Sequence, residues 1–336
     1  MSIPAKQALT IGLYIMRQKM KRRKRYPLVL MLEPLFRCNL ECIGCGKIQK
    51  PNEILKQNLS VDECLKAARE CNAPVVSIAG GEPLMHPDIE GIVQGLIRQG
   101  RYIYLCTNAL LLESFLGKFP VHEQLTLSIH LDGMEEEHDR IVDQKGTFKV
   151  AVDVVKKAKA MGYRVTSATT FFNNTTVEQA EEFLDFLQPL GMDGVTLASA
   201  FQYPDAPDQE HFFGRKKTHE FFDALFAKNT NGRWDINHSP LYLEFLRGKK
   251  DHYECTPWGN PSYSVLGWQK PCYLLDDGYA ESFDELMEST EWENYGHLNN
   301  PKCADCTAHC GYEATAVEDA TSSLKGMLSS AKMIFS

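Results

Sequence analysis

The chain has 336 residues, of which 43% are hydrophobic and 10% aromatic, and its formal net charge at pH 7 is −8. This length and apolar content favour a globular protein with one large core and a second, smaller unit. The negative charge argues against a general nucleic-acid-binding protein, because phosphate binding needs lysine and arginine spread over a wide face.

The chain contains eleven cysteines. The apolar stretch at residues 8–16 precedes its basic cluster, which is the reverse of the order in a secretory signal peptide, and it is too short to span a bilayer. We therefore expect a cytoplasmic protein in a reducing compartment, where thiols serve as metal ligands and do not form disulfides.

Residues 1–25 are predicted to form an amphipathic helix with a cationic end, because apolar side chains recur at helical spacing before a run of basic residues. The apolar positions are Leu9, Leu13, Met16 and Met20, and seven of the nine residues at 17–25 are lysine or arginine. Such a helix can lie on an anionic membrane surface, which would make the protein peripheral to the inner face of the membrane. It can equally pack its stripe on the body of the protein, and the pattern does not separate the two.

Between residues 26 and 200 the chain alternates short β-rich runs with helical stretches, which is typical of right-handed β/α units around a parallel sheet. The six expected strands are Pro27–Leu35, Pro74–Ala79, Tyr102–Cys106, Leu125–Leu131, Arg164–Phe171 and Gly194–Ala198. The five expected helices are Ser60–Cys71, Pro87–Gln99, Ala109–Lys118, Thr147–Met161 and Thr176–Leu190. Residues 201–336 are rich in aromatic residues, proline and cysteine, and are predicted to form a second region that closes the mouth of this unit.

Three cysteines, Cys38, Cys42 and Cys45, lie within eight residues directly after the first expected strand. Three thiolates on one loop can hold three corners of a four-iron four-sulfur (4Fe-4S) cluster and leave the fourth iron open to another ligand. The alternative is a structural zinc site, which needs a fourth protein ligand such as His86 or Cys64. The order of strand, loop and repeated β/α units favours the cluster.

The Cys-x3-Cys-x2-Cys loop after a first strand resembles the radical S-adenosylmethionine (SAM) superfamily. The resemblance implies a partial (β/α)6 barrel, a 4Fe-4S cluster on the three loop cysteines and SAM bound at the open iron, with ligands at the carboxyl ends of the strands. One departure is Gly44, where the superfamily usually carries an aromatic residue. Packing over the cluster edge is therefore expected from elsewhere in the chain.

After the second expected strand comes Gly80-Gly81-Glu82-Pro83, at the position where the superfamily has a segment that meets the amino group of SAM. Glycines let a backbone approach a ligand closely, and the carboxylate of Glu82 can form a charge-assisted hydrogen bond with an ammonium group. An ordinary strand-to-helix turn would explain the glycines and the proline, but not their pairing with the cysteine loop.

Further cofactor contacts are expected where later strands end. His130 stands where similar enzymes usually have a serine that touches the methionine carboxylate or the ribose. Its imidazole can donate a hydrogen bond there, transfer a proton or form a purely structural bond. Weaker candidates for nucleoside contacts, each of which can also be an ordinary turn residue, are Thr107, Asn108, Thr169 and Asn173,.

Cys106 is the last residue of the third expected strand, so its side chain can face the barrel interior near the deoxyadenosyl group. A thiol S–H bond is weaker than a tertiary C–H bond, and a cysteine there can donate a hydrogen atom to a carbon radical. The alternative is a small buried hydrophobic side chain. The reaction considered below favours the donor.

Five more cysteines follow in the C-terminal region, and they are Cys255, Cys272, Cys303, Cys306 and Cys310. The first two, with Gly267 between them, resemble the opening half of the auxiliary-cluster extension called SPASM or twitch, although the rest is abbreviated. The resemblance implies one auxiliary iron-sulfur cluster. A four-cysteine zinc site is the alternative.

Over nearly its full length the chain resembles the adenosylhopane synthases of bacterial hopanoid biosynthesis. The segments that carry this resemblance are Tyr26–Pro34, Ile103–Asn108 and Pro301–Glu313. It implies a transferase that adds the 5′-deoxyadenosyl radical to the terminal alkene of diploptene (hopene), a pentacyclic triterpene, after which Cys106 donates a hydrogen atom to the tertiary radical. It also implies a one-electron reductant such as flavodoxin or ferredoxin, and no nucleic-acid partner.

An aromatic-rich stretch after the sixth expected strand agrees with a large, rigid, apolar substrate that enters from a bilayer. Its aromatic residues are Phe201, Tyr203, Phe212 and Phe213. The main competing hypothesis is a SPASM or twitch peptide maturase, in which the radical abstracts hydrogen from a peptide. A hypothesis from another class is a non-catalytic protein with zinc at both cysteine clusters.

Overall fold

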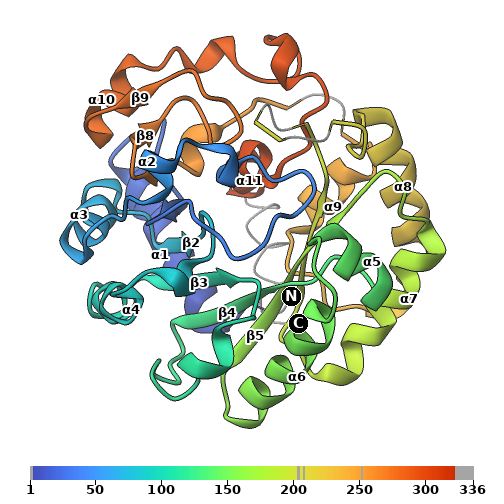
Figure 1. Cartoon of the computed structure of the whole chain (residues 1–336). Helices are drawn as coiled ribbons and strands as arrows, with labels where there is room; N and C mark the ends of the chain where they lie inside the picture. Colours follow the sequence, from blue (N-terminus) through green and yellow to red (C-terminus); the bar gives the residue numbers. More distant parts are fainter. Residues whose placement is uncertain (1–2, 203–204, 207–208, 251–252, 322–336) are drawn as a thin grey trace.

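The computed structural model describes residues 3–202, 205–206, 209–250 and 253–321. Tyr203 therefore lies outside the described residues. The fold is a curved sheet whose parallel strands alternate with helices (Figure 1). The six parallel strands are β1 (Val29–Glu33), β2 (Val75–Ile78), β3 (Tyr102–Thr107), β4 (Leu125–His130), β5 (Arg164–Phe171) and β6 (Val195–Ser199). All six expected strands are confirmed, and the observed fold class is α/β, with the six parallel strands in one curved sheet.

The C-terminal region continues the same sheet. Its order is β6-β5-β4-β3-β2-β1-β7-β8-β9. Strand β7 (Ser262–Ser264) pairs parallel with β1, while β8 (Gly267–Gln269) and β9 (Tyr279–Ala280) follow antiparallel. These strands have two or three residues, which is too short for an alternating pattern to predict them. The division into residues 1–25, 26–200 and 201–336 stays a prediction.

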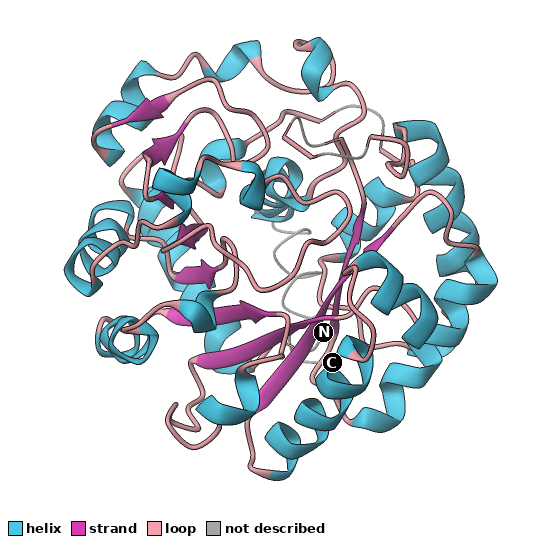
Figure 2. Ribbon diagram, viewed as in Figure 1, coloured by secondary structure: helices cyan, strands magenta, loops and turns pink. Residues whose placement is uncertain are grey.

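Four of the five expected helices are confirmed, and they lie outside the curved strands in Figure 2. They are α3 (Val61–Cys71), α4 (Ile89–Arg98), α6 (Thr147–Ala160) and α7 (Val177–Leu187). Helices α3 and α7 begin with capping boxes, in which an N-cap hydroxyl and a side chain three residues later bond to each other's backbone N–H,.

The helix expected at residues 109–118 is wrong. The segment holds only a 3₁₀ turn at Leu112–Phe115. Ala109 has a left-handed backbone (φ +68°) and Gly117 has φ +89°, so helical geometry is interrupted near both ends,. The Thr107 hydroxyl accepts a hydrogen bond from the Ala109 N–H at 3.1 Å and holds this turn.

The remaining helices were not expected, apart from the N-terminal one. They are α1 (Ala5–Met20), α2 (Asn52–Leu55), α5 (Glu135–Ile141), α8 (Arg215–Ala227), α9 (Pro240–Leu246), α10 (Phe283–Ser289) and α11 (His309–Thr321). No helix in the described part of the chain is both long enough and apolar enough to cross a bilayer.

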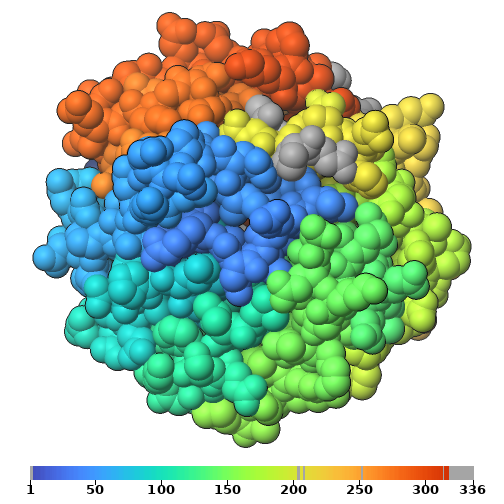
Figure 3. All heavy atoms as spheres, in the orientation of Figure 1, coloured from blue at the N-terminus to red at the C-terminus, as the bar shows by residue number. Residues whose placement is uncertain are grey.

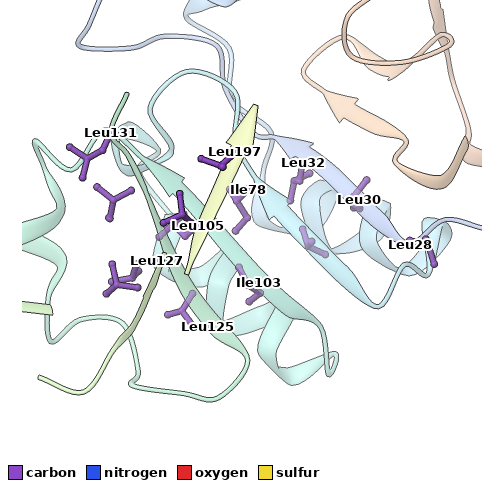
Figure 4. Close-up of a cluster of buried hydrophobic side chains, with 14 of the residues drawn as sticks. Leu28, Leu30, Leu32, Ile78, Ile103, Leu105, Leu125, Leu127, Leu131 and Leu197 are labelled. Carbon is purple, nitrogen blue, oxygen red and sulfur yellow. The ribbon is translucent and has the colours of Figure 1, made fainter. Parts of the chain in front are cut away.

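Side chains alternate between the two faces of the parallel strands. One face packs large aliphatic side chains against the helices, as Figure 4 shows for Leu30, Leu105 and Leu127, all fully buried. The opposite face turns inward and carries smaller or polar side chains such as Ser77, Cys106 and Ser128, because successive strand residues point to opposite sides. The inner face can therefore line a site.

Helix α1 lies across the amino-terminal ends of the strands. Lys6 forms an ion pair with Glu123, which precedes β4, and the Tyr14 ring packs on Tyr26, which precedes β1. The cysteine loop follows the carboxyl end of β1. The helix and the cysteine loop are therefore at opposite ends of the barrel.

Candidate active site

A cavity of about 480 Å³ lies at the carboxyl ends of the parallel strands. It brings together eleven of the residues singled out from the sequence, and these are Cys38, Cys42, Cys45, Gly80, Gly81, Glu82, Cys106, Thr107, Asn108, His130 and Thr169. Figure 3 shows the segment that contains the cysteine loop, in blue, spread over this face between the orange C-terminal region and the green β/α units. Residues up to 131 positions apart in the sequence thus lie together in the wall of this cavity.

Two predicted residues do not line this cavity. The Asn173 side-chain amide donates hydrogen bonds to the carbonyls of Glu210 (2.7 Å) and Phe212 (3.1 Å). It therefore holds the loop that follows β6, and a nucleoside contact has no support from its position. Pro83 is buried at the start of a 3₁₀ turn, Pro83–Met85, and shapes the backbone there.

The space beside Gly44 in the cysteine loop is filled by two aromatic rings from elsewhere. A Cβ atom added at Gly44 would lie 3.1 Å from the Phe212 ring and 3.4 Å from the Phe172 ring, and Gly44 has φ +76°. The expected packing from another part of the chain is thus present. Phe172 follows β5, and Phe212 comes from the region after β6. The glycine is required both by its backbone angle and by these rings.

Asn108 and helix α5 hold the cysteine loop in place. The Asn108 Nδ2 donates to Asn39 Oδ1 at 2.8 Å and lies 3.7 Å from Cys38 Sγ. On the other side, the N–H of Ile43 donates to the carbonyl of Ile141, the last residue of α5, at 2.8 Å. Asn108 lines the cavity, where a nucleoside contact stays a prediction, and its side chain also positions the cysteine loop.

The cysteine loop fits an iron-sulfur cluster better than zinc. All three thiols line the one cavity. The proposed fourth zinc ligands are elsewhere. Cys64 is buried on α3, and both ring nitrogens of His86 are bonded, one to Leu59 O and the other to the Asp88 N–H.

Burial raises the pKa of the Cys38 thiol to about 11, and it also raises the pKa of Cys42. Burial is the largest cause of these raised pKa values, and the negative charge of neighbouring groups, including the other loop cysteines, acts in the same direction,. A coordinated metal reverses this preference, since its positive charge deprotonates the thiol outright. The donors are therefore of the kind that a cationic cluster stabilises.

Gly80 and Gly81, which line the cavity, also pack closely against a neighbouring backbone. A Cβ added at Gly81 would lie 2.0 Å from the Arg37 carbonyl oxygen, and one at Gly80 would lie 2.3 Å from the Leu35 carbonyl oxygen. The Gly81 N–H donates to Leu35 O at 3.1 Å, and the Glu82 N–H donates to Arg37 O at 3.0 Å. The glycines therefore allow the motif to pack directly against the backbone that leads into Cys38.

Glu82 is a buried carboxylate with three fixed donors. Thr107 Oγ1 (2.8 Å) and the Leu84 N–H (3.0 Å) donate to Oε1, and the Asn108 N–H (2.8 Å) donates to Oε2. Burial raises its pKa, and these three donors act in the opposite direction. A carboxylate has about four acceptor positions, so one remains for a ligand in the cavity, which fits an ammonium group.

His130 forms a tight pair with Asp132. Its Nε2 lies 2.5 Å from Asp132 Oδ2, while Asp132 Oδ1 accepts from the Thr170 N–H at 2.7 Å. Burial alone would lower the pKa of His130, but the Asp132 carboxylate outweighs burial and raises it. No described residue bonds to Nδ1 of His130, so a hydrogen bond to a ligand would use that nitrogen. Thr169 donates to Leu131 O and stabilises the end of β4.

Cys106 faces the cavity from the inner side of β3. Its Sγ lies 3.5 Å from Ser77 Oγ on β2, and it pairs in register with Ser128 on β4. Burial raises the pKa of Cys106. The residue is therefore a protonated thiol at neutral pH, which keeps its hydrogen atom.

An ion pair that the sequence did not predict lies beside the cysteine loop. Glu33, the last residue of β1, is 2% exposed and accepts from Lys47 Nζ at 2.9 Å. Lys47 follows the cysteine motif by two residues and also lies over the Phe36 ring. A glutamate at the end of an otherwise apolar strand was the available signal, because buried carboxylates need a partner.

The five C-terminal cysteines meet around a second cavity of about 190 Å³, and all five line it. Burial raises the pKa of Cys306 to about 11 and of Cys272 to about 12, and neighbouring thiols contribute in the same direction. Arg215 fixes the loop by donating to the carbonyls of Ala304 (3.0 Å) and Cys306 (2.6 Å). The donor set is sufficient for a cluster with four cysteine ligands.

Residues 32–187 match the model of the radical SAM superfamily, and residues 195–330 match a model described only as a domain of unknown function, DUF3463. The first match contains the cysteine loop, the Gly-Gly-Glu-Pro segment and Cys106. The matched segment is similar to the radical SAM superfamily and covers just under half of the chain. The match supports a radical SAM enzyme with a 4Fe-4S cluster and SAM as its cofactors.

Similar solved structures agree with this radical SAM fold. SuiB from Streptococcus suis superposes with a TM-score of 0.68 at 14% identity, over 88% of this chain and 76% of that one. The structure of anSMEcpe with bound AdoMet and a Cp18Cys peptide gives a TM-score of 0.61 at 17% identity, over 84% of this chain and 87% of that one. At these identities the likeness shows the fold alone.

The curated proteins that are similar to this chain include probable GTP 3′,8-cyclases of methanogens. The protein from Methanococcus maripaludis strain C7 is 24% identical over 270 residues, covering 77% of this chain and 89% of that protein. The one from Methanocaldococcus jannaschii is 20% identical over 270 residues, with the same coverage. These names give no support to a hopanoid substrate.

Proposed function

We propose that this radical SAM enzyme transfers the 5′-deoxyadenosyl group of SAM to the terminal alkene of a hopene-type pentacyclic triterpene. Cys106 donates the hydrogen atom that completes the product. The observation that carries the proposal is the position of Cys106, a protonated thiol on the inner face of β3 in the same cavity wall as the three loop cysteines.

The wall of the cavity supports an apolar substrate. Its apolar side chains include Leu40, Ile43, Phe172, Phe201, Phe212 and Leu274. Among the described residues that line it, the only lysine or arginine is Lys47, which is already paired with Glu33. A nucleoside triphosphate such as GTP, the substrate named for the cyclases, needs several cations at its phosphates. Among the described lining residues, no lysine or arginine without a partner remains for those phosphates.

Each remaining part of the site has a role in this reaction. The cluster on Cys38, Cys42 and Cys45 supplies one electron to the SAM sulfonium when bound, with flavodoxin or ferredoxin as the source. Glu82 accepts a hydrogen bond from the SAM ammonium group, and His130 Nδ1 contacts its carboxylate or ribose. Asn108 keeps Cys38 in position.

The reaction balances with two electrons and one proton. One electron cleaves SAM to methionine and the deoxyadenosyl radical. That radical forms a carbon–carbon bond with the CH2 end of the alkene and leaves a tertiary carbon radical. Cys106 transfers its S–H hydrogen atom to this carbon, and a second electron with a proton from water restores the thiol.

The five C-terminal cysteines hold an auxiliary iron-sulfur cluster in this proposal. Phe201 and Leu274 line both cavities, so the auxiliary site adjoins the substrate. In this position the auxiliary cluster could pass the second electron toward Cys106. Iron analysis tests whether the cluster is present.

The test is an anaerobic incubation of reconstituted enzyme with SAM, dithionite and diploptene in D2O, followed by mass analysis. Wild type should give an adenosyl adduct that carries one deuterium from the exchanged Cys106 thiol. Cys106→Ala should still cleave SAM but lose the saturated adduct, whereas Cys64→Ala, a buried cysteine outside the cavity, should retain it. SAM cleavage to free 5′-deoxyadenosine without any adduct would refute the proposal and favour a hydrogen-abstracting peptide maturase.

A further inference from the structure

Helix α1 is fixed to the protein by one face. Gln7, Ile15 and Gln18 on this face are buried. Gln7 Nε2 donates to the hydroxyl of Tyr104, an inward-facing residue of β3, at 3.2 Å. The helix therefore packs on the body of the protein through a mixed polar and apolar face.

The apolar stripe of α1 points the other way. Leu9, Leu13, Met16 and Met20 are 59%, 57%, 59% and 76% exposed. They supply four of the eight large hydrophobic side chains that are exposed in the described part of the chain. Single exposed apolar residues are normal, but a contiguous row of four along one helix marks an interaction surface. The alternative that the stripe packs on the body is wrong.

The residues that follow the stripe are strongly cationic. Lys21, Arg22 and Lys24 are exposed, and none of the described carboxylates forms an ion pair with them. Arg25 forms an ion pair with Glu293 at 3.5 Å. In a chain of net charge −8, this concentration of positive charge at the end of an apolar stripe is complementary to an anionic apolar surface.

We infer that α1 docks the protein on an anionic lipid bilayer, with the stripe in the headgroup boundary and the basic run against lipid phosphates. This inference is independent of the proposed reaction. It also fixes an orientation. Since α1 and the cysteine loop are at opposite ends of the barrel, the docked enzyme presents its cavity mouth away from the bilayer.

Co-sedimentation of the full-length chain with vesicles, without SAM or alkene, tests the inference. Wild type should bind phosphatidylcholine vesicles that contain a quarter phosphatidylglycerol, and bind pure phosphatidylcholine far less. Replacing Lys21, Arg22 and Lys24 with Gln should weaken partitioning on the order of a hundredfold, since each cation near the surface contributes roughly fivefold. Raising the salt should weaken the wild type in the same direction.

Two double variants test whether vesicle binding depends on the stripe or on any exposed apolar side chain. Leu13→Gln with Met16→Gln should reduce binding by about tenfold or more, while Val150→Gln and Leu298→Gln, which change exposed apolar side chains elsewhere, should bind as wild type. Because all of these side chains are exposed, circular dichroism should show unchanged folding. Wild type that stays in the supernatant, or stripe variants that still sediment, would overturn the inference. So would a stripe-dependent dimer in analytical ultracentrifugation.

Discussion

Replacing Gly81 with alanine tests whether the Gly-Gly-Glu-Pro segment is held by the cysteine loop. The new Cβ would lie 2.0 Å from the Arg37 carbonyl oxygen and 2.5 Å from the Phe36 carbonyl oxygen. Ordinary contact begins at 3.4 Å, so one backbone must move by about 1.4 Å from the other. Neither is the end of a flexible side chain.

The movement has a calculable cost. It breaks the hydrogen bonds from Gly81 N to Leu35 O and from Glu82 N to Arg37 O, each of which contributes about 1 kcal/mol. Overpacking adds about 1–3 kcal/mol. The total, roughly 3–5 kcal/mol, is a large part of the 5–15 kcal/mol that usually stabilises a domain. The Glu82 carboxylate moves with its backbone.

We expect Gly81→Ala to bind SAM tenfold to a hundredfold more weakly, because the displaced Glu82 carboxylate loses its hydrogen bond to the ammonium group. A hydrogen bond to a charged group contributes about 1.5–3 kcal/mol. Equilibrium dialysis of reconstituted enzyme with labelled SAM measures this, with iron content determined in parallel. The control is Gly12→Ala, since a Cβ at that helical position has no atom within 4 Å. Wild-type SAM affinity in Gly81→Ala would show that the motif is not positioned by the cysteine loop.

Three further predictions concern the loop, the auxiliary cysteines and pH. Phe212→Ala should make the 4Fe-4S cluster more sensitive to oxygen, because the ring beside Gly44 is lost, whereas Phe186→Ala on α7 should not; the cluster absorbance decay in air measures this. Cys272→Ser with Cys306→Ser should lose about four irons per chain and keep SAM cleavage, while equal iron content would contradict an auxiliary cluster. Burial, with help from the charge of His130, lowers the pKa of His138 to about 4. The unfolded chain thus binds the extra proton, and stability should fall by up to about 3 kcal/mol as pH drops from 6.5 to 4. His138→Gln should flatten that decline in urea titrations, and an unchanged slope would contradict it.

The barrel was predictable because its strands are apolar runs bounded by turn residues and its main helices have caps and an apolar face. Prediction failed where tertiary contacts decide. The segment at 109–118 looks helical from its leucines, but a left-handed Ala109 held by Thr107 stops it. The strands β7 to β9 depend on the exposed edge of β1, which no local pattern reveals.

For the site, the sequence predicted most of the residues that line the cavity, but not the hydrogen-bond partners of each side chain. Asn108 and Asn173 were expected at the nucleoside. Asn108 lines the cavity and also bonds to the cysteine loop, whereas Asn173 lies outside the cavity lining and bonds to the loop after β6. Side-chain amides have both donors and acceptors, so their partners are set by whichever backbone lies near. Glu33 at the end of an apolar strand signalled a buried partner, but a salt bridge between a strand end and a loop has no fixed sequence spacing, so Lys47 was not identified as that partner.

The exposed stripe of α1 shows how structure decides between hypotheses that a pattern leaves equal. An amphipathic pattern defines two faces of a helix, but it does not show which face packs against the rest of the protein. Here the buried face carries Ile15 together with Gln7, which donates to Tyr104, and Gln18, which accepts from Arg23. Burying the stripe instead would have exposed those bonds to water and gained only apolar area. The buried face of α1 is the one with specific partners. The apolar face therefore stays exposed, available to the lipid surface that we infer.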